Sequence, residues 1–217
     1  MNVEQARFNM IEQQIRPWGV MDAHLLDLLQ RVKREDFCPP AYRNLAFADL
    51  QIPLPYGEMM LEPRVQARLV QDVQPHGQDK VLQIGAGSGY MTALLAHCAH
   101  HVLAFEIHPE LADLARQNLR HAGIERVDLK TGDGFALAAQ AGTFDAIVLC
   151  GSVSHVPHSL LEQLNVGGRL IAVVGDEPMM RATVVTRESD TVFQTTQPWD
   201  VVIPRLEGVS DTPAFTF

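Results

Sequence analysis

A glycine-rich turn between an apolar strand and an apolar helix most limits what this 217-residue chain can fold into. In the stretch KVLQIGAGSGYMTALLA, a predicted strand ends at Ile84, and Gly85, Gly87 and Gly89 lead into a predicted helix. Glycine lets the backbone approach a ligand closely there, and the first turn of the helix presents free amide groups. Such a turn is typical of a ligand-binding α/β sheet.

The spacing of the glycines separates two classes of cofactor. A dinucleotide fingerprint, G-x-G-x-x-G, needs glycine at its sixth place, and that place is Tyr90 here. The chain has G-x-G-x-G instead, the turn that methyltransferases use around the methionine carboxylate and the ribose. The pattern therefore favours a methyltransferase and disfavours an NAD-dependent oxidoreductase.

Two further polar positions follow the next two predicted strands. Glu106 ends the second strand, and its two carboxylate oxygens match the two hydroxyl donors of a ribose. Asp133, between Gly132 and Gly134, follows the third strand, where an acid can accept from an adenine amino group. Because ligands of such sheets bind at the carboxyl ends of the strands, the three signals together predict a nucleoside site.

Apolar runs and amphipathic stretches alternate from residue 79 to residue 175. The predicted strands span 81–84, 101–105, 127–130, 144–150 and 170–174, and the predicted helices span 90–97, 109–122 and 158–164. Runs such as AIVLC and LIAVV are apolar on both faces, as strands covered on both sides must be. The alternation predicts an α/β fold with a Rossmann-like, doubly wound methyltransferase core over residues 79–217.

The first 78 residues predict a helical cap that also serves as a substrate lid. A first helix with apolar residues at helical spacing stops at Pro17, Asp22 is the N-cap of a second, and a third spans 65–73. The irregular stretch 39–63 is too long for a mere connection. At the other end, we expect a short β-rich tail, with an antiparallel pair turning near Ser189 and Asp190 and a last strand at 201–203.

Charge and composition limit which molecules the protein is expected to bind and where in the cell it is expected to be. The chain carries 17 basic and 26 acidic side chains, a formal net charge of −9, which opposes binding to nucleic acid. Cys38, Cys98 and Cys150 are too few and too scattered for a disulfide framework, so we expect reduced thiols. The charged N-terminal segment is unlike a signal peptide, and no apolar run approaches the ~20 residues of a membrane span. The sequence predicts a cytoplasmic protein.

Several segments resemble the protein-L-isoaspartate (D-aspartate) O-methyltransferase family, over nearly the whole chain. The segments are RVKREDFCPPAYRNLAFADLQIPL, VLQIGAGSGYMTALLA, FEIHPEL, GDG and FDAIVLCGSVSHVPHSLLEQLNVGGRLIAVVG. Near the end, Ile203-Pro204 and Gly208 resemble the family's V-P-L segment. The most specific motif is L-x-x-Q-L-x-x-G-G-R-L. It spans residues 160–170 and includes Leu161, Gln163, Leu164, Gly167, Gly168 and Arg169.

The resemblance implies an S-adenosyl-L-methionine-dependent enzyme that methylates the free carboxylate of isoaspartyl residues, the first step in repair of damaged proteins. By resemblance, the cofactor-binding residues are Gln83, Gly85, Gly87, Gly89, Glu106 and Asp133. Gln83 stands where such enzymes usually carry an acid facing the methionine ammonium. The resemblance implies no metal.

The chain departs from the family around its substrate pocket. Where the family reads glycine-glutamine-threonine-isoleucine-serine-glutamine-proline, this chain reads GEMMLEP, so Leu61 takes the place of the pocket hydroxyl and Met59 replaces the threonine. An apolar side chain cannot donate to a substrate carboxylate, and Glu58 and Glu62 add like charge. Two alternatives stay open: a methyltransferase for another small molecule or protein site, and a non-catalytic cofactor-binding relative.

Five other side chains are weaker candidates for roles in the site. His155 and His158 follow the fourth predicted strand, Tyr56 lies in a Pro-Gly loop, and Arg64 and Arg205 are candidate clamps for a carboxylate. In each case a loop, packing or surface role is the commoner one.

Overall fold

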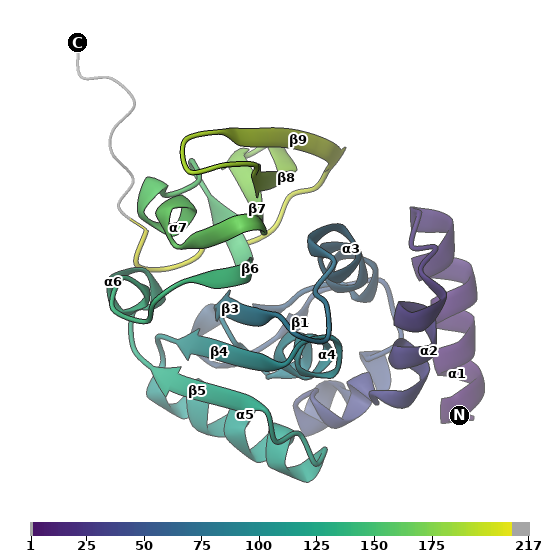
Figure 1. The fold of residues 1–217 in the computed structure, drawn as a ribbon. Helices are drawn as coiled ribbons and strands as arrows, with labels where there is room; N and C mark the ends of the chain where they lie inside the picture. The colour runs from purple at the N-terminus through teal and green to yellow at the C-terminus, as the bar shows by residue number, and fades with distance from the viewer. Residues whose placement is uncertain (1, 210–217) are drawn as a thin grey trace.

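The computed structural model describes residues 2–209, and a seven-stranded sheet forms its centre (Figure 1). The strand order is β5-β4-β3-β6-β7-β8-β9. The bounds are β3 (Lys80–Ile84), β4 (His101–Glu106), β5 (Val127–Thr131), β6 (Phe144–Val153), β7 (Leu164–Asp176), β8 (Met179–Arg187) and β9 (Phe193–Asp200). The strands from β5 to β7 are parallel, whereas β8 and β9 are antiparallel to their neighbours. The five parallel strands fall where the sequence predicted them.

Helices cover both faces of the parallel part of the sheet. Successive side chains of a strand point to opposite faces, so the apolar strands present apolar side chains on both faces. On β4, Val102 and Ala104 pack in one cluster with α3 (Pro63–Val73), α4 (Tyr90–Cys98) and α5 (Pro109–His121). Leu103 and Phe105 pack in a second cluster with α6 (Gly134–Ala138) and α7 (His158–Glu162). The doubly wound, Rossmann-like core is confirmed. The helix α6 was not predicted, and α7 is shorter than predicted because Leu164 already starts β7.

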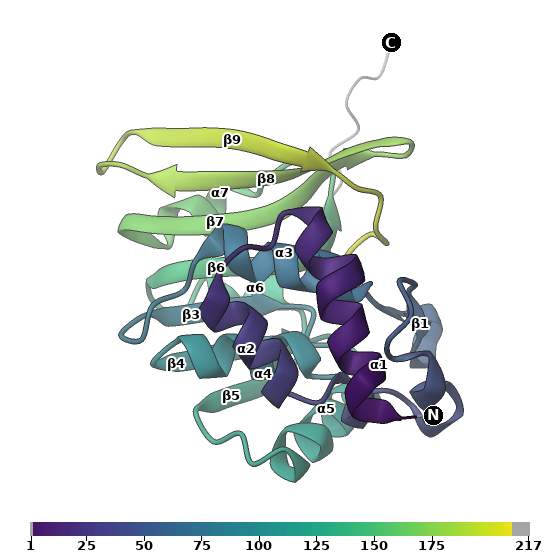
Figure 2. The same ribbon diagram turned by 90° about the vertical axis from the view of Figure 1, so that its right-hand side faces the viewer.

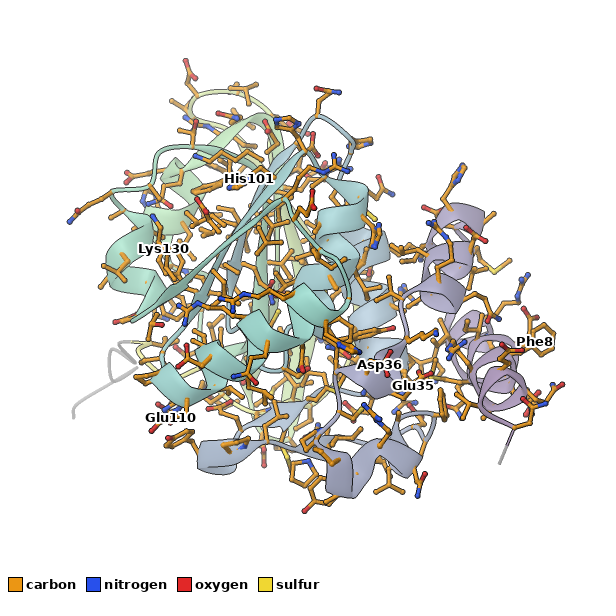
Figure 3. The ribbon with its side chains drawn as sticks, turned by 90° about the horizontal axis from the view of Figure 1, so that it is seen from below. Phe8, Glu35, Asp36, His101, Glu110 and Lys130 are labelled. Atoms are coloured by element: carbon orange, nitrogen blue, oxygen red, sulfur yellow. The ribbon has the colours of Figure 1, made fainter. Side chains whose placement is uncertain are left out.

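The N-terminal helices stack on the α3–α4 side of the sheet (Figure 2). The first is α1 (Val3–Met10), extended by a π-helical turn (Ile11–Ile15) and a 3₁₀ turn (Arg16–Trp18) that contains Pro17. As predicted, Asp22 caps α2 (Ala23–Arg31), with its Oδ1 accepting from the backbone N–H of His24 at 2.8 Å. A buried ion pair between Arg7 and Glu35 joins α1 to the 3₁₀ turn Arg34–Asp36 (Figure 3).

The stretch 39–63 is compact rather than extended. It contains the 3₁₀ turns Pro40–Leu45 and Pro55–Gly57 and a small hairpin of β1 (Ile52–Pro53) and β2 (Met59–Met60). Between the two short strands, Tyr56 has the left-handed backbone angle φ 67°, which only a few per cent of non-glycine residues adopt. The hairpin is therefore held in a specific conformation by its surroundings.

The tail differs from the prediction in one respect. The hairpin of β8 and β9 forms as expected, but the predicted strand at 201–203 is wrong. After β9 the chain leaves the sheet edge and returns to the carboxyl end of β6, where the Ser152 N–H donates to the carbonyl of Pro204 at 2.8 Å. The Leu206 N–H then donates to the Ser152 carbonyl at 3.0 Å. Because a proline has no N–H, Pro204 limits this contact to an isolated bridge.

No helix within residues 2–209 is long and apolar enough to cross a membrane.

Candidate cofactor and substrate site

The glycine turn lies at the carboxyl ends of β3 and β4 and needs its glycines for two reasons. Gly85, Gly87 and Gly89 all have positive φ angles, of 85°, 55° and 87°. A Cβ atom on Gly89 would also lie 3.2 Å from the carbonyl oxygen of Ala115 in α5. The turn therefore fits only residues without a side chain, and it brings the N-terminal end of α4 to the edge of the sheet.

Glu106 is buried at the end of β4, with 4% of its surface exposed, and its carboxylate is tied to the turn. Its Oε2 accepts from the Gly87 N–H at 2.8 Å, and its Oε1 accepts from the His108 N–H at 3.2 Å. A carboxylate oxygen can accept more than one hydrogen bond. Each oxygen thus keeps capacity for a further donor, and the role of Glu106 as an acceptor for ribose hydroxyls stays a prediction.

Gln83 is fully buried in β3 and has an orphan acceptor. Its Nε2 donates to the Gly85 carbonyl at 3.2 Å and to the Cys150 Sγ at 3.3 Å. Its Oε1 is buried and accepts no hydrogen bond from any residue between 2 and 209. A buried unpaired acceptor costs ~1–3 kcal/mol, so a donor on a bound ligand would stabilise this arrangement. The role of Gln83 as an acceptor for the ammonium group of S-adenosyl-L-methionine stays a prediction, since Gln83 does not line either part of the crevice described below.

Asp133 lies at the same edge but has a structural task as well. Its Oδ1 caps α6, accepting from the N–H of Phe135 at 2.9 Å and of Ala136 at 3.4 Å. Gly208 packs against this carboxyl group so closely that a Cβ there would lie 2.9 Å from the Asp133 Oδ1. The role of Asp133 as an adenine acceptor stays a prediction, and the capping role explains the short helix that follows it.

An open crevice runs over the glycine turn in two neighbouring parts, with cavity volumes of about 40 Å³ and about 30 Å³. Gly85, Glu58, Glu106 and Leu206 line both parts. The apolar lining of the larger part is Leu54, Met59, Met60, Leu61, Met91 and Leu206. The β1–β2 hairpin and the glycine turn therefore line one cavity, although they are distant in sequence.

Leu61 contributes an apolar side chain to this cavity and is itself 3% exposed. Its backbone carbonyl accepts from the Arg34 Nη2 at 2.7 Å, and Arg34 also donates to the Ala46 carbonyl at 3.0 Å and to the Gln66 side chain. Arg34 is completely buried, and the loss of hydration lowers its pKa. Sequence reasoning missed Arg34, because a charged residue in a polar stretch such as VKRED reads as exposed.

The segment around Leu206, which follows β9, forms one side of the crevice. The sequence did not predict this position. Leu206 packs against the glycine turn and β6 so tightly that a Cβ on Gly85 would lie 2.9 Å from it, and one on Gly151 would lie 2.8 Å from it. The only signal in the sequence was the resemblance of Ile203-Pro204 and Gly208 to the family's V-P-L segment. That signal marks the segment but does not say where it packs.

Glu58 is half-buried at the junction of the two parts. Burial raises its pKa above the usual range, the negative charges of Glu106 and Glu207 raise it further, and His108 opposes the shift. His108 stacks on the ring of Tyr56, with centroids 4.4 Å apart and planes within 5°. The predicted candidate Tyr56 is therefore a packing partner at the rim and is 52% exposed.

The remaining candidates lie outside the crevice lining, as far as residues 2–209 show. Arg64 pairs with Asp49 at 3.0 Å and lies 3.8 Å from the centre of the Trp18 ring. Arg205 pairs with Asp176. His155 and His158 contact Ser154 and Glu162 at the surface. Both arginines are therefore paired with an aspartate in this arrangement.

Comparison with known proteins gives a consistent result. The family model described as protein-L-isoaspartate(D-aspartate) O-methyltransferase matches residues 5–205. The protein-L-isoaspartate O-methyltransferase of Koribacter versatilis is 37% identical over 209 residues, covering 96% of this chain and 94% of its own length. The protein-L-isoaspartate O-methyltransferase 2 of Marinobacter nauticus is 35% identical over 213 residues, covering 98% of this chain and 97% of its own.

Solved structures agree on the fold. A candidate protein-L-isoaspartate O-methyltransferase from Plasmodium falciparum, in complex with S-adenosyl-L-homocysteine, superposes with a TM-score of 0.79 at 18% identity. The match covers 93% of this chain and 98% of that one. A second protein-L-isoaspartate O-methyltransferase gives a TM-score of 0.77 at 22% identity, covering 95% of this chain and 66% of its own.

Proposed function

The chain belongs to the protein-L-isoaspartate(D-aspartate) O-methyltransferase family. We propose that its crevice binds S-adenosyl-L-methionine next to an isoaspartyl carboxylate, beside Leu61, so that the methyl group is transferred to the carboxylate. The chain is a methyltransferase that depends on this cofactor. The observation that carries the site assignment is the buried Glu106 carboxylate, which the glycine turn itself holds in place through the Gly87 N–H at 2.8 Å. A carboxylate fixed in this way is prepared for a ribose before any ligand arrives.

Each cofactor-binding residue has a separate task in this proposal. The orphan Oε1 of Gln83 accepts from the methionine ammonium, and the N–H groups at the start of α4 face the methionine carboxylate. Glu106 accepts the ribose hydroxyls, and Asp133 accepts at the adenine end with the oxygen that does not cap α6. Gly85, Gly87 and Gly89 keep the backbone close to the ligand.

The methyl transfer mainly requires that the cofactor and the acceptor carboxylate are held in line with each other. The bound cofactor supplies a methyl group activated by its sulfonium charge. A carboxylate with a reference pKa of ~3.9 is already an anion at pH 7, so the crevice needs no general base. Holding the two reactants in line can supply several of the ~7–11 kcal/mol available from proximity. We assign this positioning to the lid within residues 1–78, which faces the core of residues 79–217 across the crevice.

Acceptor recognition is where this chain departs from its family. The larger part of the crevice is lined mainly by apolar side chains, with the neutral polar side chains of Gln66 and Ser88 and the two carboxylates of Glu58 and Glu106. No cationic side chain from residues 2–209 lines it. That lining suits a cationic cofactor better than an anionic acceptor. It specifically favours a second candidate, transfer to an uncharged small molecule or another protein site in the same crevice.

The proposal also covers the setting of the reaction. The three cysteines are free thiols, and the net charge of −9 opposes nucleic acid as an acceptor. Both support a cytoplasmic enzyme that acts on proteins or peptides containing isoaspartyl residues.

The deciding experiment uses methyl-labelled S-adenosyl-L-methionine with an isoaspartyl peptide and its aspartyl twin. Label transfer to the isoaspartyl peptide alone supports the family reaction. Transfer to neither peptide, combined with tight binding of S-adenosyl-L-homocysteine in calorimetry, supports the second candidate. An absence of binding heat with both cofactor forms contradicts the cofactor assignment itself.

A further inference from the structure

Three side chains from distant parts of the chain converge at the rim of the crevice. Glu58 comes from the lid hairpin, His108 from the loop between β4 and α5, and Glu207 from the segment after β9. One ligand atom of each, the imidazole nitrogen and two carboxylate oxygens, lies within 4.8 Å of the other two. The pairwise distances from His108 Nε2 are 3.4 Å to Glu207 and 3.9 Å to Glu58.

These distances are close to those of a coordination shell. Tetrahedral zinc binds nitrogen and oxygen at ~2.0–2.2 Å, which places its ligand atoms about 3.4 Å apart. The contact between His108 and Glu207 has this length, and the contact with Glu58 needs a shift of about half an ångström. An imidazole with two carboxylates is a donor set for zinc and related transition metals, whereas calcium and magnesium prefer oxygen alone.

A second observation points to a ligand at this place. The Nε2 atom of His108 is fully buried and forms no hydrogen bond with any residue between 2 and 209, although its side chain is aimed at both carboxylates. The ring is held there, because it stacks on Tyr56 and because the His108 N–H donates to Glu106.

We propose that Glu58, His108 and Glu207 form a binding site for a divalent transition-metal cation, with zinc as the reference ion. The imidazole and two carboxylates leave one coordination position open, as sites with three protein ligands do. The cation would neutralise the two glutamates at the rim. It would also fasten both covering segments, since Glu58 belongs to the lid and Glu207 follows the Leu206 that packs on Gly85.

The site escaped detection in the sequence for a simple reason. Metal motifs are recognised by short spacing, such as two histidines on one helical turn, and these three ligands are scattered over the whole chain. The sequence-based expectation of no metal came from the family resemblance, which implies none. The proposal is independent of which acceptor the enzyme methylates.

The test is calorimetric titration of the full chain with Zn²⁺, repeated with Co²⁺, whose visible absorption reports the ligand set. We expect one high-affinity site per chain in the wild type. His108→Asn and Glu207→Gln should each weaken it by at least an order of magnitude, since even indirect ligand contacts are worth ~10–100-fold. The matched control is His158→Asn, which removes a histidine that also lies 3.4 Å from a glutamate, but at an exposed pair. It should leave the affinity unchanged.

A second measurement reports whether the metal holds the segments of Glu58 and Glu207 over the crevice. Zn²⁺ should slow the dissociation of S-adenosyl-L-homocysteine from the wild type and have no effect on the Glu207→Gln variant, whose far-UV spectrum checks that it folds. No zinc heat in the wild type, or equal zinc affinity in wild type, His108→Asn and Glu207→Gln, overturns the proposal. A dissociation rate that depends on pH but not on metal would identify the cluster as an ion pair instead.

Discussion

Glu106 illustrates how a single side chain can belong both to the fold and to the site. Its carboxylate accepts one backbone N–H from the glycine turn and one from the following loop. Removing it therefore affects the shape of the turn as well as the contact with a ribose. A variant that keeps the shape but loses the charge separates the two contributions.

We expect Glu106→Ala to weaken binding of S-adenosyl-L-homocysteine by about 1.5–3 kcal/mol, since charge-assisted hydrogen bonds are lost. Glu106→Gln should lose less, because its amide oxygen can still accept. Isothermal calorimetry measures both. Unchanged affinity in the alanine variant would remove Glu106 from the cofactor site.

Leu61 is the residue on which substrate recognition depends most. It lies in the crevice wall where the family carries a hydroxyl, so we expect isoaspartyl methylation by the wild type to be weak. A carboxylate deprived of one donor loses on the order of 1–3 kcal/mol, a factor of ~5–150 in rate. Leu61→Ser should raise the rate with an isoaspartyl peptide, and the added change Glu62→Gln should raise it further.

The stability of these variants has to be measured beside their activity. Leu61 is 3% exposed, and replacing a buried leucine by a small residue typically costs ~2–5 kcal/mol. Leu61→Ala is the matched control, since it makes the same cavity without a hydroxyl. Equal rates for Leu61→Ser and Leu61→Ala, or fast turnover by the wild type, would show that another group holds the acceptor.

The three thiols provide a prediction about pH. Burial raises the pKa of Cys38 and of Cys98 to about 11 and that of Cys150 to about 12, from an ordinary value of 9.0. The fold therefore favours the neutral thiols, a stabilising contribution that is present below pH 9 and lost as the pH rises through 11–12. At pH 8 the native thiols should react with a disulfide reagent at least about 100-fold more slowly than in the unfolded chain. Rapid native reaction of any cysteine at pH 8 would contradict this burial.

At the scale of elements, local signals were reliable where the element's own residues decide its structure. The alternation of apolar and amphipathic runs located β3 to β7, and Asp22 marked the start of α2. Both features are determined by residues that are close together in the sequence. The strand predicted at 201–203 was wrong for the opposite reason. Its valines and isoleucine suit a strand, but the next residues bond to Ser152, far away in the chain, so that the segment leaves the sheet edge. The roles of Arg34 and Leu206 likewise depend on packing between distant segments.

The cap of α2 can be tested by substitution. Asp22→Ala removes the acceptor for the N–H groups of His24 and Leu25, at 2.8 and 3.4 Å, and should lower the free energy of unfolding by about 1 kcal/mol. The matched control is Asp27→Ala on the same helix, where the exposed pair with Arg31 contributes little. Urea unfolding of the two variants gives the comparison, and equal losses would refute the capping account.

At the scale of the whole molecule, the cap and the core share one hydrophobic cluster. Residues such as Met10 and Leu29 of the cap pack in the same cluster as Val81 and Val102 of the sheet. The two tryptophans lie at the same junction: Trp18 of the cap meets Trp199 of β9 edge-on at 6.3 Å. We therefore predict that the cap, residues 1–78, does not fold independently of the core.

Equilibrium unfolding in urea provides the test. Tryptophan fluorescence reports the junction, and far-UV circular dichroism reports the helices and the sheet, so both should give one transition with the same midpoint. An earlier fluorescence transition would mean that the cap detaches before the core unfolds.

The return of the chain to β6 after β9 has a consequence for biosynthesis. The wall formed by Leu206 is translated after all seven strands, and proteins made at ~5–20 residues per second begin to fold before synthesis ends. A nascent chain can thus complete its sheet while the crevice is still open on one side. The ability to retain a ligand is acquired after the sheet is complete, so emergence of the segment around Leu206 from the ribosome, rather than assembly of the sheet, would time the appearance of activity.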